Sequence, residues 1–113
     1  MTLTEADIRW LVSRITAFHD TERIFLFGSH AGDEARRDSD IDLLIIGPSG
    51  IPYHHRGKHV ASALRGFSSK FDLLFFTAEE LDEQLADPLS FLSSIVSDSR
   101  LLYDRRTETS RRA

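Results

Sequence analysis

The segment Ile41–Ile46 is the feature that most restricts how this chain can fold, because every residue in it except Asp42 is apolar. A strand with apolar side chains at successive positions is buried on both faces, as in a sheet that carries helices on each side. The segment therefore predicts a central strand that is covered on both sides for most of its length. Asp40 and Asp42 lie at its leading end and, being two residues apart, point to the same face.

Three further segments are predicted as strands because they are short and rich in Ile, Phe and Leu. They are Arg23–Phe27, Phe71–Phe76 and Arg100–Asp104. Gly28 ends the first of them. Asp72 interrupts the otherwise apolar pattern of the second.

Helices are predicted around these strands from apolar residues at helical spacing. Thr2 and Glu5 have the spacing of a capping box at the start of the first helix. The predicted helices are Thr4–Phe18, about His54–Phe67, Ala78–Ala86 with Leu81 and Leu85 on its inner side, and a last helix that starts at Pro88 and carries Leu89.

The length of the chain, 113 residues, allows one hydrophobic core, so residues 1–104 are predicted to form a single domain. Residues 105–113 include four arginines, and a flexible tail is the usual form of such an end. The alternative for this segment is a contact with nucleic acid or with a partner.

Charge and composition exclude several classes of function. The net charge of −4 disfavours direct binding to nucleic acid, which requires positive surface charge. Cysteine is absent, which excludes disulfides and thiolate metal sites. No apolar run approaches the roughly 20 residues of a membrane span, and the acidic N-terminus does not resemble a signal peptide. We therefore expect a cytoplasmic protein with no membrane contact.

The predicted chemistry depends on three carboxylates, those of Asp40, Asp42 and Asp72. If the strands of Asp42 and Asp72 are neighbours in register, all three acids lie at one end of the sheet. Clustered carboxylates repel one another unless cations neutralise them, and Mg²⁺ prefers such oxygen ligands. Two metal ions roughly 3.5–4 Å apart can hold the attacking and leaving oxygens of a phosphoryl transfer.

A structural interpretation of the same acids remains open. An aspartate before a strand is usually a turn residue, so Asp40 alone would mean little. Asp72 is harder to explain in this way, because an unpaired charge inside an apolar strand is costly to bury.

Gly28 and Ser29 follow the first predicted strand and precede the aspartate pair. Glycine allows a ligand to approach the backbone closely, and a serine at the start of a helical turn offers its hydroxyl and N–H groups to phosphate. A Gly-Ser pair alone is a weak signal. Its position after a strand and before the acids makes it a candidate phosphate turn.

Gly28-Ser29, ten residues, and then Asp40-Ile41-Asp42 resemble the signature of the DNA polymerase β-like nucleotidyltransferase superfamily. The small size of the chain is similar to that of the minimal nucleotidyltransferase (MNT) group, and the resemblance covers nearly the whole chain. It implies an α+β (α/β) fold with a mixed β-sheet and helices packed on it. It also implies binding of Mg²⁺ and of a nucleoside triphosphate, usually ATP.

The resemblance also implies roles for individual residues. Asp40 and Asp42 would be metal ligands for two Mg²⁺ ions. Asp72 would complete the metal site and help to deprotonate the acceptor hydroxyl. Gly28 and Ser29 would hold the triphosphate.

The turn after Gly28 departs from the family pattern. Many relatives have Gly-Ser-Arg-Ala-Arg-Gly, whereas this chain has His30-Ala31-Gly32-Asp33 after Ser29. Two basic residues that could face phosphates are therefore replaced. Arg36 stands where relatives often have arginine and remains a candidate for nucleotide binding. The departure leaves the metal ligands intact and predicts weaker binding of the triphosphate.

Many members of this family are antitoxins paired with a HEPN-domain toxin, a helical RNase, which they neutralise by adding AMP to a tyrosine. The resemblance thus implies AMPylation of a partner HEPN toxin, in a homo- or hetero-oligomer. One alternative is an antitoxin that acts by binding without catalysis. Another is transfer to a small molecule or an RNA end, which the lack of a further substrate domain disfavours.

Three histidines have two interpretations. His55 and His59 are spaced i, i+4 on a predicted helix, as in some transition-metal sites, and His54 precedes them. The polar surroundings favour a solvated helix face instead.

Overall fold

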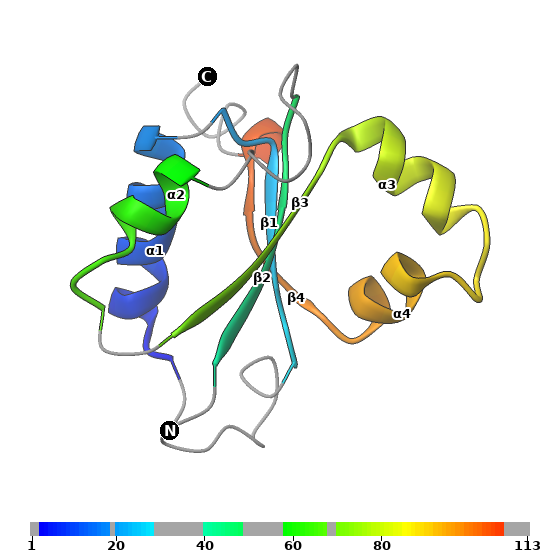
Figure 1. The fold of residues 1–113 in the computed structure, drawn as a ribbon. Helices are drawn as coiled ribbons and strands as arrows, with labels where there is room; N and C mark the ends of the chain where they lie inside the picture. Colours follow the sequence, from blue (N-terminus) through cyan, green and yellow to red (C-terminus); the bar gives the residue numbers. More distant parts are fainter. Residues whose placement is uncertain (1–2, 19, 29–39, 49–57, 68–69, 108–113) are drawn as a thin grey trace.

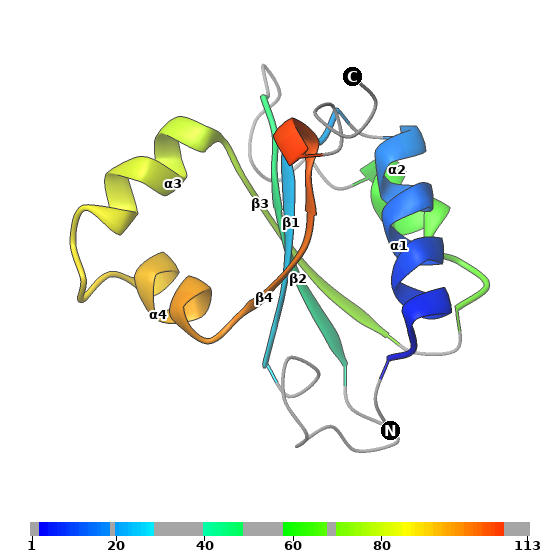
Figure 2. The same cartoon turned by 180° about the vertical axis from the view of Figure 1, so that it is seen from behind.

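The computed structural model describes residues 3–18, 20–28, 40–48, 58–67 and 70–107. They form a four-stranded sheet with helices on both faces (Figure 1; Figure 2 shows the reverse side). In chain order the elements are α1 (Glu5–Phe18), β1 (Arg23–Phe27), β2 (Ile41–Ile46), α2 (Lys58–Ala63), β3 (Phe71–Phe76), α3 (Ala78–Leu85), α4 (Phe91–Ser97) and β4 (Arg100–Asp104). All four strands have the predicted bounds. None of the described helices is long and apolar enough to cross a membrane.

The strand order in the sheet is β3-β2-β1-β4. β1 runs antiparallel to both β2 and β4, whereas β2 runs parallel to β3. Parallel neighbours need a crossover connection, and α2 lies in the connection between β2 and β3. The predicted α+β architecture, a mixed sheet with helices packed on it, is confirmed.

β2 separates two hydrophobic clusters, one on each face of the sheet. Leu43 and Ile45 belong to the cluster beneath α1 and α2, whereas Leu44 and Ile46 belong to the cluster beneath α3 and α4. All four side chains are fully buried. Figure 1 shows the two pairs of helices on opposite sides of the strands. The prediction of a central strand covered on both faces is confirmed.

The start of α1 differs from the predicted capping box. The Asp7 N–H donates to Oγ1 of Thr4 at 3.0 Å, and the Thr4 N–H donates to Oδ2 of Asp7 at 2.9 Å. This reciprocal pair closes the first turn in the same way as a capping box, with an aspartate in place of glutamate. The prediction that Thr2 and Glu5 cap the helix is wrong, because the helix begins at Glu5.

α2 ends at Ala63, four residues before the predicted end, and residues 54–57 of the predicted helix lie outside the described residues. After the helix the chain passes through Gly66, whose φ of +100° suits glycine and is incompatible with a continuing helix.

α4 begins at Phe91, three residues later than predicted. The Ser90 hydroxyl caps the helix by accepting the Ser93 N–H at 3.1 Å, so the first turn starts after Ser90 and not at Pro88. Leu89 therefore lies outside the helix, where its side chain is 93% exposed.

The chain remains attached to the domain just beyond β4. The Arg105 N–H donates to the Glu22 carbonyl at 2.8 Å, and its guanidinium donates to the Thr21 carbonyl at 3.0 Å and pairs with the Asp20 carboxylate. Residues 108–113 lie outside the described residues. The single domain over 1–104 and the tail over 105–113 stay predictions.

We expect Leu44→Ala to lower the free energy of unfolding by about 2–5 kcal/mol, because it leaves a cavity between the sheet and the helices α3 and α4. Urea unfolding with an unchanged m-value would measure the loss. Leu101→Ala is the matched control, since Leu101 is 49% exposed, and it should cost about 1 kcal/mol or less. Equal losses in the two variants would contradict the assignment of β2 as the centre of the core.

Candidate functional site

The three predicted acids come together at one end of the sheet because of the strand directions. β2 and β3 are parallel, so they begin at the same end of the sheet, and antiparallel β1 ends there. Asp40 immediately precedes β2, Asp42 is its second residue, and Asp72 is the second residue of β3. The topology thus places three acids from two segments, and Gly28 from a third, at the same end of the sheet.

Asp42 and Asp72 are direct register partners on neighbouring strands. Both lie on the sheet face that α3 and α4 cover further along, because Leu44 and Leu74, two residues beyond each acid, pack in that cluster. Asp42 is half-buried, whereas Asp40 and Asp72 are exposed. The conditional prediction that these strands are neighbours in register is confirmed.

Gly28 makes the closest backbone approach to this group of acids. Its φ is +73°, and a Cβ atom at this position would lie 2.1 Å from Oδ2 and 3.1 Å from Cγ of Asp42. Contacts of 2.1 Å do not occur between real atoms of this kind, so a side chain at position 28 would displace the Asp42 carboxylate. The glycine therefore has a structural role that the sequence did not indicate, which is to leave room for the Asp42 carboxylate.

The carboxylates lie at the same end of the sheet but are not close enough together to form a complete set of metal ligands. Among the residues that the structure describes, no three acidic or histidine side chains gather closely enough to hold a metal ion. The Asp42 carboxylate lies against Gly28, on the β1 side of β2, whereas Asp72 belongs to β3 on the other side. Asp40 and Asp72 are exposed, so both can change rotamer. Oxygen donors of this kind fit a hard divalent cation once these side chains turn inward.

Several predicted site residues cannot be placed. Ser29, Arg36 and the unusual turn His30–Asp33 lie outside the described residues, as do His54 and His55. His59 falls within α2. The predicted roles of these residues stay predictions.

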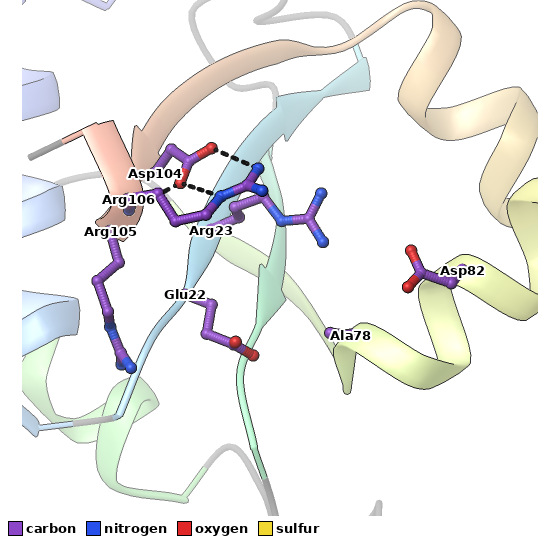
Figure 3. Close-up of a pocket in the computed structure, with 7 residues that line it drawn as sticks. All are labelled: Glu22, Arg23, Ala78, Asp82, Asp104, Arg105 and Arg106. Carbon is purple, nitrogen blue, oxygen red and sulfur yellow. Dashed lines mark hydrogen bonds and ion pairs between the residues drawn. The ribbon is translucent and has the colours of Figure 1, made fainter. Parts of the chain in front are cut away.

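A separate pocket of about 320 Å³ lies at the opposite end of the sheet (Figure 3). Its lining residues come from the start of β1, the end of β4 and α3, and they are Glu22, Arg23, Ala78, Asp82, Asp104, Arg105 and Arg106. The side-chain hydrogen bond from Arg106 outweighs burial and lowers the pKa of the Asp104 carboxyl from its usual value. No sequence motif marks this pocket, because its charges come from separate segments.

A family model described as "Nucleotidyltransferase domain" matches residues 8–103 of the chain. The match extends from α1 to β4 and includes Gly28 and all three acids. None of the curated proteins compared with the sequence matches it significantly.

The fold is similar to those of three solved structures. A protein from Sulfolobus solfataricus described as a nucleotidyltransferase has a TM-score of 0.58 and 22% identity, with 88% of this chain and 78% of that chain covered. A toxin–antitoxin with AMP-PNP has a TM-score of 0.58 and 19% identity, with coverage of 90% and 77%.

The third is a mutant of the toxin–antitoxin MntA–HpeT in which two aspartates, two positions apart, are replaced by glutamate. It has a TM-score of 0.54 and 17% identity, with 89% of this chain and 76% of that chain covered. At these identities the similarity shows a common fold.

We expect Gly28→Ala to destabilise the protein, because it adds a Cβ atom against the Asp42 carboxylate and imposes a positive φ on alanine. The backbone part of the cost is about 1–2 kcal/mol. A double-mutant cycle with Asp42→Ala, measured by urea unfolding, separates the two causes. Removing the carboxylate should recover about 1 kcal/mol or more of the loss. If Gly28→Ala costs the same in both backgrounds, the contact with the Asp42 carboxylate is not responsible.

Proposed function

The chain belongs to the nucleotidyltransferase domain family, and on that basis we propose that it transfers AMP from ATP to a hydroxyl group of a partner protein. The observation that supports this most directly is the pairing of Asp42 with Asp72 in register, with Asp40 at the same end of the sheet. Carboxylates at one end of the sheet are ligands of the kind that hold the metal ions of phosphoryl transfer.

We assign Asp40, Asp42 and Asp72 as the ligands of Mg²⁺, with two ions in the working site. The assignment is supported by the preference of Mg²⁺ for carboxylate oxygens and by the position of the three carboxylates at one end of the sheet. When bound, the ions would neutralise the charge of the triphosphate and polarise the transferred phosphoryl group. The protein's own contribution is to hold Asp42 in position through β2 and Gly28.

We assign Asp72 a second role, which is to take the proton of the acceptor hydroxyl. The acceptor oxygen would bond to the α-phosphorus as the bond to pyrophosphate breaks. Asp72 is exposed on an edge strand, where an incoming hydroxyl can approach it. Gly28, Ser29 and Arg36 are proposed to hold the triphosphate, on the strength of the sequence pattern.

The proposed acceptor is a tyrosine of a HEPN-type toxin, and the proposed biological role is that of an antitoxin in the cytoplasm. Support comes from two structural relatives that are toxin–antitoxin structures, one of them with AMP-PNP, an analogue of ATP. The protein would then work in a hetero-oligomer with its toxin.

A second candidate function is neutralisation of the toxin by binding alone. It is supported by the open arrangement of the acids, since no three of the described acidic or histidine side chains gather at metal-binding distance. The replacement of basic residues in His30–Asp33 supports it as well.

We expect the protein, given ATP labelled at the α-phosphate, Mg²⁺ and the product of the adjacent gene, to label that product. The double variant Asp40→Asn, Asp42→Asn should lower the labelling rate about a hundredfold or more, because both are proposed metal ligands. Glu5→Gln is the matched control, since it removes an exposed carboxylate on α1 and should not affect the rate. Neutralisation of the toxin by the double variant, without labelling, would instead establish the binding-only function.

We expect Mg²⁺ and ATP together to stabilise the fold, because a ligand that binds only the native state shifts the unfolding equilibrium. At about 100 times the dissociation constant the gain is roughly 2.7 kcal/mol. Thermal unfolding with ATP and Mg²⁺, compared with ATP and EDTA, measures it. The absence of any shift at millimolar ATP would contradict the nucleotide-binding assignment.

A further inference from the structure

The segment 77–99, which contains α3 and α4, has an unusual distribution of charge. It contains acidic residues and no lysine, arginine or histidine, and the acids are Glu79, Glu80, Asp82, Glu83, Asp87 and Asp98. These six charges exceed the net charge of −4 of the whole chain, so the remainder of the chain is net positive. All of these acids except the half-buried Glu80, which caps α3, are exposed. The charged side chains of the two helices are therefore all negative, and one of them, Asp82, also lines the pocket that contains Arg23 and Arg106.

Three large apolar side chains are exposed where α3 ends and α4 begins. Leu89 is 93% exposed, Phe91 61% and Leu85 39%. We call these three residues the apolar tip. Leu81, which was predicted together with Leu85 to lie on the inner side of α3, is fully buried, whereas Leu85, one turn later at the last residue of the helix, is exposed and does not join the core. Figure 1 shows this connection far from the sheet, at the outer end of the two helices.

The connection that carries the apolar tip is held by hydrogen bonds. The Leu89 N–H donates to Oδ1 of Asp87 at 3.0 Å, and the Ser93 hydroxyl donates to the Asp87 carbonyl at 2.8 Å. Gln84 accepts the Ser90 hydroxyl through its carbonyl at 2.7 Å and the Leu92 N–H through its side chain at 3.1 Å.

These bonds hold the backbone at exposed Leu89, whereas Leu92, three residues further on, is fully buried in the core. Because the backbone of this connection is already ordered, a partner that binds there restricts the exposed side chains but does not have to order a loop.

We propose that the apolar tip and the surrounding acids form a docking surface for a partner protein that presents a basic, amphipathic helix. Exposed apolar side chains with charged residues on the same surface are typical of the centre and rim of protein interfaces. The negative charge selects a basic partner through electrostatic complementarity. The proposal rests on the proposed function, since it describes how the acceptor protein is held.

The same charge disfavours other occupants. A second copy of this chain that docked through the same surface would bring two acidic surfaces together, and like charges at an interface are strongly unfavourable. Nucleic acid and anionic membranes carry the same sign as this surface. The surface lies on the same face of the sheet as Asp42 and Asp72, so a protein bound there is on the same side of the sheet as these acids.

The test uses two synthetic peptides of about 18 residues, long enough to form a helix on binding. Both carry leucine at i, i+3, i+4 and i+7, one with lysine at all other positions and the other with glutamate. We expect the lysine peptide to bind the full chain, with an affinity that falls between about 50 mM and 300 mM salt, and the glutamate peptide not to bind. Fluorescence anisotropy measures both.

The double variant Leu89→Ser, Phe91→Ser should weaken binding of the lysine peptide about tenfold or more, because it removes the proposed anchors. Leu101→Ser is the matched control, since it removes an exposed leucine on β4 and should leave the affinity unchanged. Equal binding of both peptides, or unchanged binding by the double variant, would overturn the proposal. So would sedimentation data showing a wild-type dimer that the double variant dissociates, which would assign the surface to a second copy.

The proposed docking surface and the proposed nucleotide transfer can be refuted independently of each other. The variant Asp40→Asn, Asp42→Asn should bind the lysine peptide as the wild type does, whereas Leu89→Ser, Phe91→Ser should retain the thermal shift with ATP and Mg²⁺. If the wild type does not bind the lysine peptide but is stabilised against thermal unfolding by ATP and Mg²⁺, the docking surface is refuted and the nucleotide-binding assignment is not.

Discussion

β2 is the element on which the other parts of this structure depend, because it is enclosed in every direction. It pairs with β1 on one side and β3 on the other, and its alternate side chains are buried beneath two different pairs of helices. A strand buried in this way has one register that satisfies both faces, since a shift by one residue would exchange them. The position of Asp42 is therefore set by the packing of the residues that follow it.

The candidate site lies at the end of β2 that the helices do not cover completely. Asp42 is half-buried, between the fully buried core of β2 and exposed Asp40. Gly28 faces it from the end of β1, and the absence of a side chain leaves space for the carboxylate. A rigid strand thus supplies one well-placed acid, while the two exposed acids can adjust to a ligand. This combination of a fixed and a movable group is compatible with either catalysis or binding.

The arrangement of charge connects the site to the proposed partner. The helices α3 and α4 cover the same sheet face as the acids, and their own charged side chains are all acidic, with the apolar tip between the two helices. The face opposite is covered by α1 and α2 (Figure 2). The candidate site and the proposed docking surface therefore share one face of the sheet.

Local sequence determined the parts of this protein that depend on residues close together in the chain. The strands could be predicted because each is a short apolar run with clear ends in the sequence. Asp72 could be singled out because it interrupts such a run. The first residue of α4 could not be predicted in this way, because the cap formed by Ser90 competes with the helix start that Pro88 favours.

The tertiary structure alone decided the rest. The strand order and the contact between Gly28 and Asp42 depend on segments that are distant in the sequence and meet only when the sheet forms. The position of the connection that carries Leu89 depends on the hydrogen bonds of Ser90 and Leu92 with Gln84. The sequence therefore identified the acids and their strands, whereas long-range pairing decided how those acids face one another.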